Sequence, residues 1–138
     1  GCGSGILSLM MAQRSEGNMR IDAIDIDEGA VIDSKNNFAA TPWNKNLNAI
    51  CCNFVSFTKE CTKKYDIVIS NPPFFSEDTL SPDIKRSSAR NTSSLSFDSL
   101  FEGVSDIIAT NGLFAMITPA ESYSYLAQIA LLKIFLKR

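Results

Sequence analysis

The chain has 138 residues, a hydrophobic content of 45% and a formal net charge of −2 at pH 7. This length predicts one domain over residues 1–138, and the hydrophobic content is high enough to exclude a disordered chain. The sequence contains no histidine, which excludes histidine-ligated metal sites and the commonest general base, and the charge balance leaves any nucleic-acid contact to local cations.

Helical and strand patterns alternate along the chain. The secondary structure of residues 54–64 is ambiguous from the sequence, and the polar residues 75–94 predict a long loop. Apolar runs at helical spacing predict helices over residues 6–14, 28–41, 97–110 and 120–133, the third of which is expected to end at Asn111-Gly112. Short apolar runs predict strands over residues 21–25, 48–52, 65–70 and 113–118.

The alternation indicates an α/β fold, with a mostly parallel sheet and helices on both faces. The chain begins at Gly1 with no initiator methionine, so its glycine-rich start has no strand to follow. We therefore expect a truncated domain whose first strand is missing, and the close at "LLKIFLKR" predicts that sequence is missing there as well.

The four cysteines, Cys2, Cys51, Cys52 and Cys61, form no C-x-x-C pair. A zinc site or a thioredoxin-like site is therefore not expected, and we predict no metal. The sequence shows no signal peptide and no long apolar segment. We expect a monomer in the reducing cytoplasm, without a membrane anchor.

Three candidate ligand-binding features lie early in the chain, where helix starts and strand ends meet. Gly1, Gly3 and Gly5 open a helix, and glycine lets the backbone approach a ligand closely, although a tight strand-to-helix turn would look the same. Asp25 follows about 20 residues later, the spacing at which a carboxylate can accept hydrogen bonds from ribose hydroxyls. Asn53 follows the next strand and is expected either to meet an adenine edge or to be a solvated turn residue.

The fourth feature is the stretch Asn71-Pro72-Pro73-Phe74, which directly follows the strand "YDIVIS". Proline fixes φ, so the carbonyl of Pro72 is held rigidly, and the side chain of Asn71 offers a second acceptor. Together they can hold the two hydrogens of a planar exocyclic amine, and Phe74 can stack on the ring that bears it. Accepting both hydrogens draws the nitrogen lone pair out of conjugation, so the amine can attack without a histidine base. The alternative is an ordinary Asn-Pro turn.

This stretch resembles the N-P-P-[FYW] motif of S-adenosylmethionine-dependent amino-methyltransferases. The start Gly1-Cys2-Gly3-Ser4-Gly5 is similar to the end of their D-x-G-x-G-x-G cofactor loop, and Asp25 matches their ribose-binding acid. Asn53 stands where an aspartate often contacts adenine. The resemblance implies a Rossmann-like fold with S-adenosylmethionine bound by Gly1, Gly3, Gly5, Asp25 and Asn53, and with Asn71, Pro72 and Phe74 at the acceptor.

The following residues resemble the bacterial tRNA(Val) adenine-N6 methyltransferases more narrowly. That family carries S-P-D-x-x-[KR] and then A-R-[HN]-T-x-x-L-[ST]-F after N-P-P-F-F. The matching positions here are Ser81-Pro82-Asp83 with Arg86, and Ala89-Arg90-Asn91-Thr92 with Leu95, Ser96 and Phe97. The resemblance implies N6-methylation of the anticodon-loop adenine-37 of a tRNA, whose base would leave its stack to enter the site.

Three cations of the loop, Lys85, Arg86 and Arg90, could hold tRNA phosphates, although solvated loop charges would look the same. Two other enzyme classes share the N-P-P-aromatic motif, the protein glutamine-N5 and the rRNA guanine-N2 methyltransferases, and the residues from Ser81 to Phe97 argue against both. A module that binds cofactor or RNA without catalysis is the alternative from another functional class.

Overall fold

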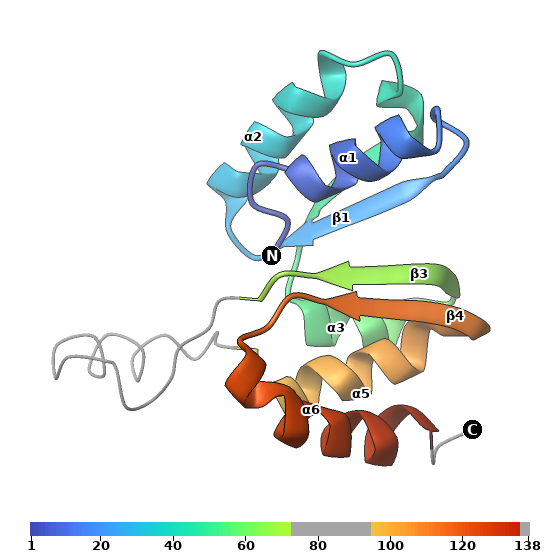
Figure 1. The fold of residues 1–138 in the computed structure, drawn as a ribbon. Helices are drawn as coiled ribbons and strands as arrows, with labels where there is room; N and C mark the ends of the chain where they lie inside the picture. The colour runs from blue at the N-terminus through green and yellow to red at the C-terminus, as the bar shows by residue number, and fades with distance from the viewer. Residues whose placement is uncertain (73–94, 136–138) are drawn as a thin grey trace, which may run out of the picture. The chain divides into compact units, whose positions relative to one another are not determined.

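The computed structural model describes residues 1–72 and 95–135 of the chain. The chain divides into two compact units, Gly1–Glu60 and Cys61–Arg138. Each unit contains a two-stranded sheet (Figure 1), and both sheets are parallel. The predicted α/β fold with parallel strands is confirmed, whereas the single domain stays a prediction.

The sheet of the first unit consists of β1 (Ile21–Asp25) and β2 (Leu47–Cys51). The two strands pair without a shift, so that Asp25 at the end of β1 lies opposite Cys51 at the end of β2. Both strands therefore end at the same edge of the sheet. A backbone hydrogen bond from the Cys52 N–H to the Asp25 carbonyl (2.9 Å) extends the pairing one residue further.

Helices α1 (Ile6–Arg14) and α2 (Glu28–Ala39) cover one face of this sheet. Side chains alternate between the faces of a strand, so Ala23 shares a face with its partner Ala49 and with Leu47. These residues pack with both helices in one core, and the helices therefore lie on that same face. The buried members of the core are Ala12, Ala23, Val31, Phe38, Leu47 and Ala49.

Local signals set the bounds of α2. The carboxylate of Asp27 accepts a hydrogen bond from the Ala30 N–H (2.7 Å), which satisfies one of the free donors at the start of a helix. The helix ends at Ala39, before Pro42, as the sequence predicts. A short 3₁₀ segment, Asn44–Asn46, leads into β2, and the ambiguous residues after Asn53 form α3 (Phe54–Glu60).

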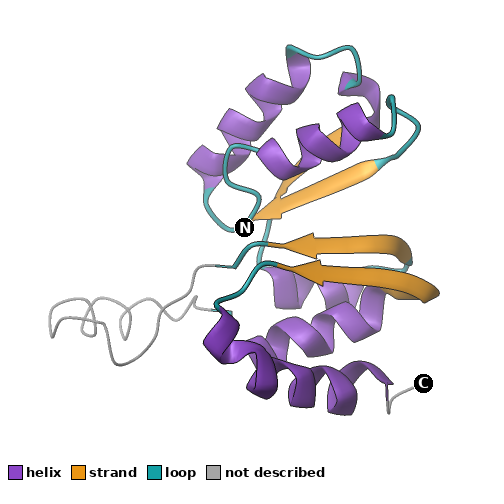
Figure 2. Ribbon diagram, in the orientation of Figure 1, coloured by secondary structure: helices purple, strands orange, loops and turns teal. Residues whose placement is uncertain are grey.

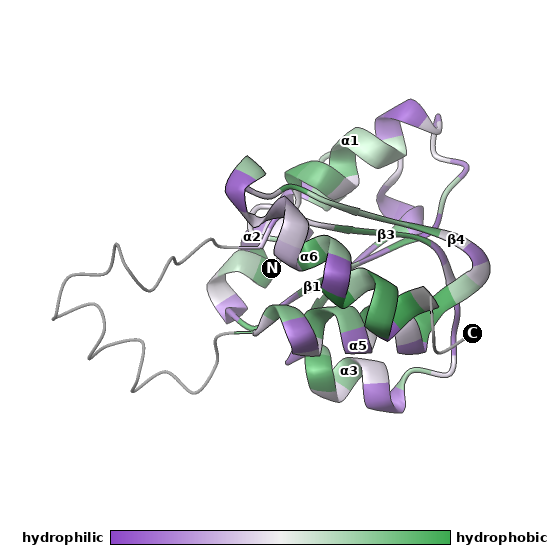
Figure 3. Ribbon diagram, turned by 60° about the horizontal axis from the view of Figure 1, so that its bottom comes forward, coloured by the Kyte–Doolittle hydropathy of each residue, from purple (hydrophilic) through white to green (hydrophobic). Residues whose placement is uncertain are grey.

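The second unit pairs β3 (Tyr65–Ser70) with β4 (Ile108–Met116), seen as two adjacent orange arrows in Figure 2. Helix α5 (Phe97–Ile107) packs on this sheet through an edge-to-face contact of Phe101 with Phe114, whose ring centroids lie 5.4 Å apart. The remaining helical segments are a 3₁₀ turn (Ala120–Ser122), α6 (Tyr123–Ala130) and a π-helical segment (Leu131–Phe135). Figure 3 shows that hydrophobic (green) and hydrophilic (purple to pale) residues alternate along α5 and α6.

The boundary between α5 and β4 differs from the prediction. The sequence predicts a helix as far as residue 110, but α5 ends at Ile107 and β4 already begins at Ile108. The pairing slips here, since Tyr65 lies opposite Ile108 while Ile67 lies opposite Leu113. A side chain at Gly112 would lie 3.0 Å from the Tyr65 carbonyl oxygen. The glycine that the sequence analysis assigned to a helix end therefore permits a close approach inside an irregular strand.

No helix in residues 1–72 and 95–135 combines the length and the apolar character that crossing a membrane requires.

Candidate functional site

The glycine loop, residues 1–5, runs beside the end of β1 and leads into α1. The Cys2 N–H donates to the Ile24 carbonyl (2.8 Å), which ties the start of the loop to β1. The Gly5 N–H donates to the Cys2 carbonyl (2.9 Å). Gly5 has a φ of 80°, in the left-handed region that glycine adopts readily. The loop therefore turns sharply and presents the first N–H groups of α1, which have no partner within the helix.

Asp25 is held against this loop by its carboxylate. One oxygen, Oδ2, accepts the Gly3 N–H (2.8 Å), and the other, Oδ1, accepts the Asp27 N–H (3.1 Å). Partial burial pushes the pKa of Asp25 upward, but these hydrogen bonds from Gly3 and Asp27 outweigh burial, so the pKa lies below its ordinary value. The structure thus brings Asp25 and the glycine loop together, and the carboxylate carries its charge at neutral pH.

Gly1 also lies beside this carboxylate, because a β-carbon built on Gly1 would be 3.5 Å from Asp25 Oδ2. Gly1 and Gly3 therefore lie beside Asp25 at one edge of the first sheet, and Gly5 belongs to the same loop but packs against α2. Their role in binding a ligand stays a prediction.

Asn53 follows β2 at the same edge, but the structure gives its side chain a local role. Oδ1 of Asn53 accepts the N–H groups of Val55 (2.9 Å) and Ser56 (3.2 Å), and so caps the start of α3. The side-chain NH₂ of Asn53 makes no hydrogen bond with the residues that the structure describes. Any contact of Asn53 with an adenine ring would therefore use this NH₂ as a donor, and the contact stays a prediction.

Asn71 and Pro72 belong to the second unit and directly follow β3. The Ile117 N–H donates to the Ser70 carbonyl (3.1 Å), which keeps the ends of β3 and β4 paired up to the residue before Asn71. Asn71 is exposed, and its side chain makes no hydrogen bond within residues 1–72 and 95–135. No residue in the described part of the chain therefore occupies the two acceptor sites of Asn71 Oδ1, and a ligand can use both. Phe74, Lys85, Arg86 and Arg90 lie outside the described residues.

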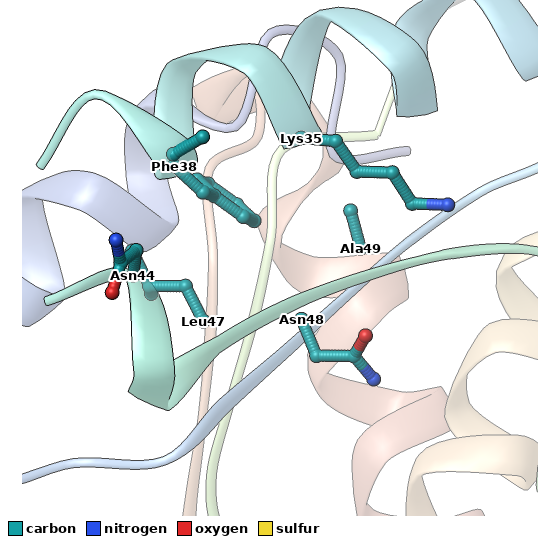
Figure 4. A pocket seen from close by; sticks show the side chains of 7 residues that line it. Lys35, Phe38, Asn44, Leu47, Asn48 and Ala49 are labelled. Carbon is teal, nitrogen blue, oxygen red and sulfur yellow. The ribbon is translucent and has the colours of Figure 1, made fainter.

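A hollow between α2 and β2 is a separate feature of the first unit. Figure 4 shows Phe38 and Lys35 reaching from the helix toward the strand that carries Leu47 and Ala49. Its volume is about 210 Å³, below the roughly 300–1,000 Å³ of typical ligand pockets. None of the glycine-loop residues, Asp25 or Asn53 lines it, so we assign it no part in the candidate site. The lining residues are Lys35, Phe38, Ala39, Asn44, Leu47, Asn48 and Ala49.

The four cysteines are free thiols. Burial and then the neighbouring Cys51 raise the pKa of Cys52, which favours its protonated form. Among the described residues, no group of three or more cysteine and acidic side chains is arranged to hold a metal ion.

Sequence reasoning missed two side chains that contact the glycine loop. Ser34 Oγ donates to the Gly3 carbonyl (2.8 Å), and Asn37 Nδ2 donates to the Ser4 carbonyl (2.9 Å). Both residues lie on α2. A signal was available for Ser34, which is a polar residue on the buried stripe formed by Val31 and Phe38. No comparable signal marks Asn37, which is exposed.

The crowding around Gly5 predicts a large effect of substitution. A β-carbon at Gly5 would lie 2.5 Å from Phe38 Cε1 and 3.0 Å from Ser34 Oγ. Gly5→Ala should therefore lower the free energy of unfolding by about 2–4 kcal/mol, adding overpacking to backbone strain. Urea denaturation measures this loss.

Gly3→Ala is the matched control for this prediction. Gly3 also has a positive φ of 53°, but nothing lies within 4 Å of a β-carbon there. The control should lose only about 1 kcal/mol, from strain alone. Equal losses for the two variants would contradict the packing of Gly5 against α2.

Comparison with known proteins gives a consistent set of relatives. The family model described as "Methyltransferase small domain" matches residues 1–94. A protein of Shewanella halifaxensis named "tRNA1(Val) (adenine(37)-N6)-methyltransferase" is 41% identical over 130 residues, which are 94% of this chain and 52% of the relative. A protein of Bacteroides thetaiotaomicron with the same name is 36% identical over 121 residues, 88% of this chain and 50% of the relative. The chain thus spans about half the length of these relatives, and the resemblance indicated by the sequence motifs is confirmed.

Proposed function

Because this chain belongs to the methyltransferase small domain family, we propose that the protein transfers a methyl group from S-adenosylmethionine to N6 of an adenosine in tRNA. The observation that carries the proposal is the pairing of the glycine loop with the ionised Asp25 at one sheet edge, in a chain that also has Asn71-Pro72-Pro73-Phe74 after a strand. The names of the relatives support adenine 37 of tRNA1(Val) as the target.

The residues present fit the nucleoside part of this cofactor. Asp25 carries a negative charge and lies half-buried at the end of β1, so its oxygens can accept hydrogen bonds from the two ribose hydroxyls. The glycine loop and the start of α1 supply backbone N–H donors, and the small residues leave room for a close approach. We propose that Gly1, Gly3, Gly5 and Asp25 hold the cofactor, with the NH₂ of Asn53 donating to the adenine ring.

When bound, S-adenosylmethionine supplies a methyl group made electrophilic by a positively charged sulfur. The chain's part is to prepare the accepting amine. Asn71 Oδ1 and the carbonyl of Pro72 each accept one hydrogen of the exocyclic NH₂, so the nitrogen lone pair turns toward the methyl group instead of the aromatic ring. Phe74 would hold the base by stacking.

Proton transfer in this scheme does not require a histidine, which the chain lacks. As the nitrogen bonds to the methyl carbon, the bond from that carbon to sulfur would break and neutral S-adenosylhomocysteine would leave. The positive charge would pass from sulfur to the nitrogen, whose N–H groups then become strongly acidic. The proton then leaves from the hydrogen bond to Asn71 or Pro72 to solvent. A positioned acceptor pair is therefore enough, and no group with a pKa near 7 is needed.

The substrate in this proposal is a splayed base of an RNA loop, the form in which proteins usually read RNA sequence. Lys85, Arg86 and Arg90 follow the Asn71 motif in the sequence, and we propose that they bind phosphates near the target nucleotide. A monomeric state and a cytoplasmic location stay predictions.

The test is to ask which macromolecule accepts the methyl group. Full-length protein is incubated with labelled S-adenosylmethionine and, separately, with unmodified tRNA, rRNA and a mixture of cell proteins. Label in tRNA alone is the expected result. Label in rRNA or in protein would keep the amine chemistry and replace the substrate, and cofactor binding without any labelled acceptor would replace the enzyme with a binding module.

A further inference from the structure

Two side chains of α2 hold consecutive carbonyl groups of the glycine loop. Ser34 Oγ donates to the Gly3 carbonyl at 2.8 Å, and Asn37 Nδ2 donates to the Ser4 carbonyl at 2.9 Å. Residues three apart on a helix lie on neighbouring turns of one side, so α2 can reach both carbonyls at once. The loop is therefore fixed from outside by a helix that lies about 30 residues further along the chain.

These contacts decide where the N–H groups of the loop point. In a planar trans peptide unit the C=O and the following N–H point in opposite directions. Holding the Gly3 carbonyl toward Ser34 therefore turns the Ser4 N–H away from α2. The Gly3 N–H is already used by Asp25, and the Gly5 N–H by the Cys2 carbonyl. Within residues 1–72 and 95–135, the Ser4 N–H has no partner and is left for a ligand.

The position of Ser34 is informative because it is a costly place for a hydroxyl group. Ser34 is 0% exposed and lies on the buried stripe of α2, between Val31 and Phe38. A buried hydroxyl must be hydrogen-bonded to offset its loss of water. Its hydroxyl donates to the Gly3 carbonyl, and its oxygen lies 3.3 Å from Cys2 Sγ in a second hydrogen-bonding contact. Both of its hydrogen bonds are thus made to residues of the glycine loop.

We propose that Ser34 and Asn37 are positioning residues for S-adenosylmethionine, acting through the backbone of the glycine loop without touching the cofactor. This inference rests on the proposed function, since it assigns a ligand to that loop. The two side chains pre-set the loop in its binding conformation, so the protein does not lose conformational freedom there when the cofactor binds. They do not touch the methyl acceptor.

The expected signature is a loss of cofactor affinity without a loss of turnover. Removing the Asn37 donor should raise the Kd for S-adenosylhomocysteine and the KM for S-adenosylmethionine roughly three- to tenfold, the range that one net hydrogen bond gives. The kcat at saturating cofactor and the KM for tRNA should stay at the wild-type values. A merely structural role would lower the amount of folded enzyme. It would leave the Kd for S-adenosylhomocysteine and the KM for S-adenosylmethionine unchanged.

The decisive variant is Asn37→Asp in the full-length protein. Aspartate has nearly the same shape but only acceptor oxygens at neutral pH, so it faces the Ser4 carbonyl with no hydrogen to donate. The matched control is Asn36→Asp, the same change at the neighbouring residue. Asn36 is exposed, and its side chain makes no hydrogen bond within the described ranges. Titration calorimetry with S-adenosylhomocysteine compares the two variants with the wild type.

Ser34 supplies a second pair of variants. Ser34→Ala removes the hydroxyl, and Ser34→Thr retains it at the cost of one extra methyl group. If both fold, alanine should weaken binding about tenfold, and threonine should restore most of the loss. If crowding unfolds the threonine variant, the Asn37 comparison still decides.

The outcomes separate the inference from the proposed function. Weaker binding by Asn37→Asp than by Asn36→Asp, with kcat unchanged, supports the positioning role. Equal affinity of both variants and the wild type overturns the inference and leaves the proposed function intact. Absence of S-adenosylhomocysteine binding by the wild-type protein overturns the cofactor assignment and the inference with it.

Discussion

Asn71→Ala in the full-length protein should lower kcat for methyl transfer on the order of 10²–10³-fold, the loss seen when one positioned hydrogen-bonding group is removed from a reacting centre. The affinity for S-adenosylhomocysteine should stay at the wild-type value. The reason is that Asn71 is proposed to contact the accepting amine of the substrate, whereas Asp25 and the glycine loop are proposed to hold the cofactor. Without the amide oxygen of Asn71, the lone pair of the substrate NH₂ stays conjugated with the aromatic ring, and the amine remains a poor nucleophile.

The control for this experiment is Asn36→Ala. It removes an exposed asparagine whose side chain has no hydrogen-bond partner in the described ranges. The kcat for methyl transfer and the affinity for S-adenosylhomocysteine should therefore both stay unchanged. Single-turnover assays at saturating cofactor isolate the chemical step. Wild-type turnover in Asn71→Ala would show that the amine is not activated by this acceptor pair.

Asp25→Asn should have the opposite signature, with a large loss of cofactor affinity. A hydrogen bond to a charged group contributes about 1.5–3 kcal/mol, and about 1.4 kcal/mol corresponds to a tenfold change in affinity. We therefore expect the Kd for S-adenosylhomocysteine to rise on the order of 100-fold. The substitution also turns a donor toward either Gly3 or Asp27, whose N–H groups both point at the Asp25 carboxylate.

Asp33→Asn is the matched control for Asp25→Asn, since it removes one negative charge from an exposed residue of α2. Equal Kd values for both variants would contradict the assignment of Asp25 to the ribose.

The dependence of stability and affinity on pH gives a second check of Asp25. The pKa of Asp25 is lower in the folded protein, so its charged form contributes stability above its unfolded pKa, and this contribution is lost as the pH falls through the folded pKa. Wild-type affinity should therefore not change across the neutral range on account of Asp25.

The elements that the sequence predicted well carry their signals locally. The strand from Ile21 to Asp25 and the helix that Asp27 caps agree with the pattern of apolar residues and acids in that stretch. The pairing of Asp25 with the glycine loop also agrees with their spacing, because consecutive strand ends and helix starts in an α/β unit share one edge.

The features that the sequence did not predict depend on contacts between distant residues. Ile108 continues a helical pattern, but its pairing with Tyr65 draws it into β4, and tertiary pairing overrides the local preference. Asn37 meets Ser4 only because α2 packs beside the glycine loop, and nothing in the composition around Asn37 indicates this. The position of Asn53 after its strand follows from the sequence, but the capping of α3 by its oxygen depends on the conformation of the turn.

The most direct test of the proposed reaction is to find the atom that receives the methyl group. Unmodified tRNA1(Val) is incubated with the full-length protein and S-adenosylmethionine, digested with nucleases, and its nucleosides and fragments are identified by mass. N6-methyladenosine in the fragment that contains adenine 37 is the predicted result. Methylation of a guanine, of a ring nitrogen or of a ribose would contradict an acceptor pair built from Asn71 and Pro72 to hold an adenine amine.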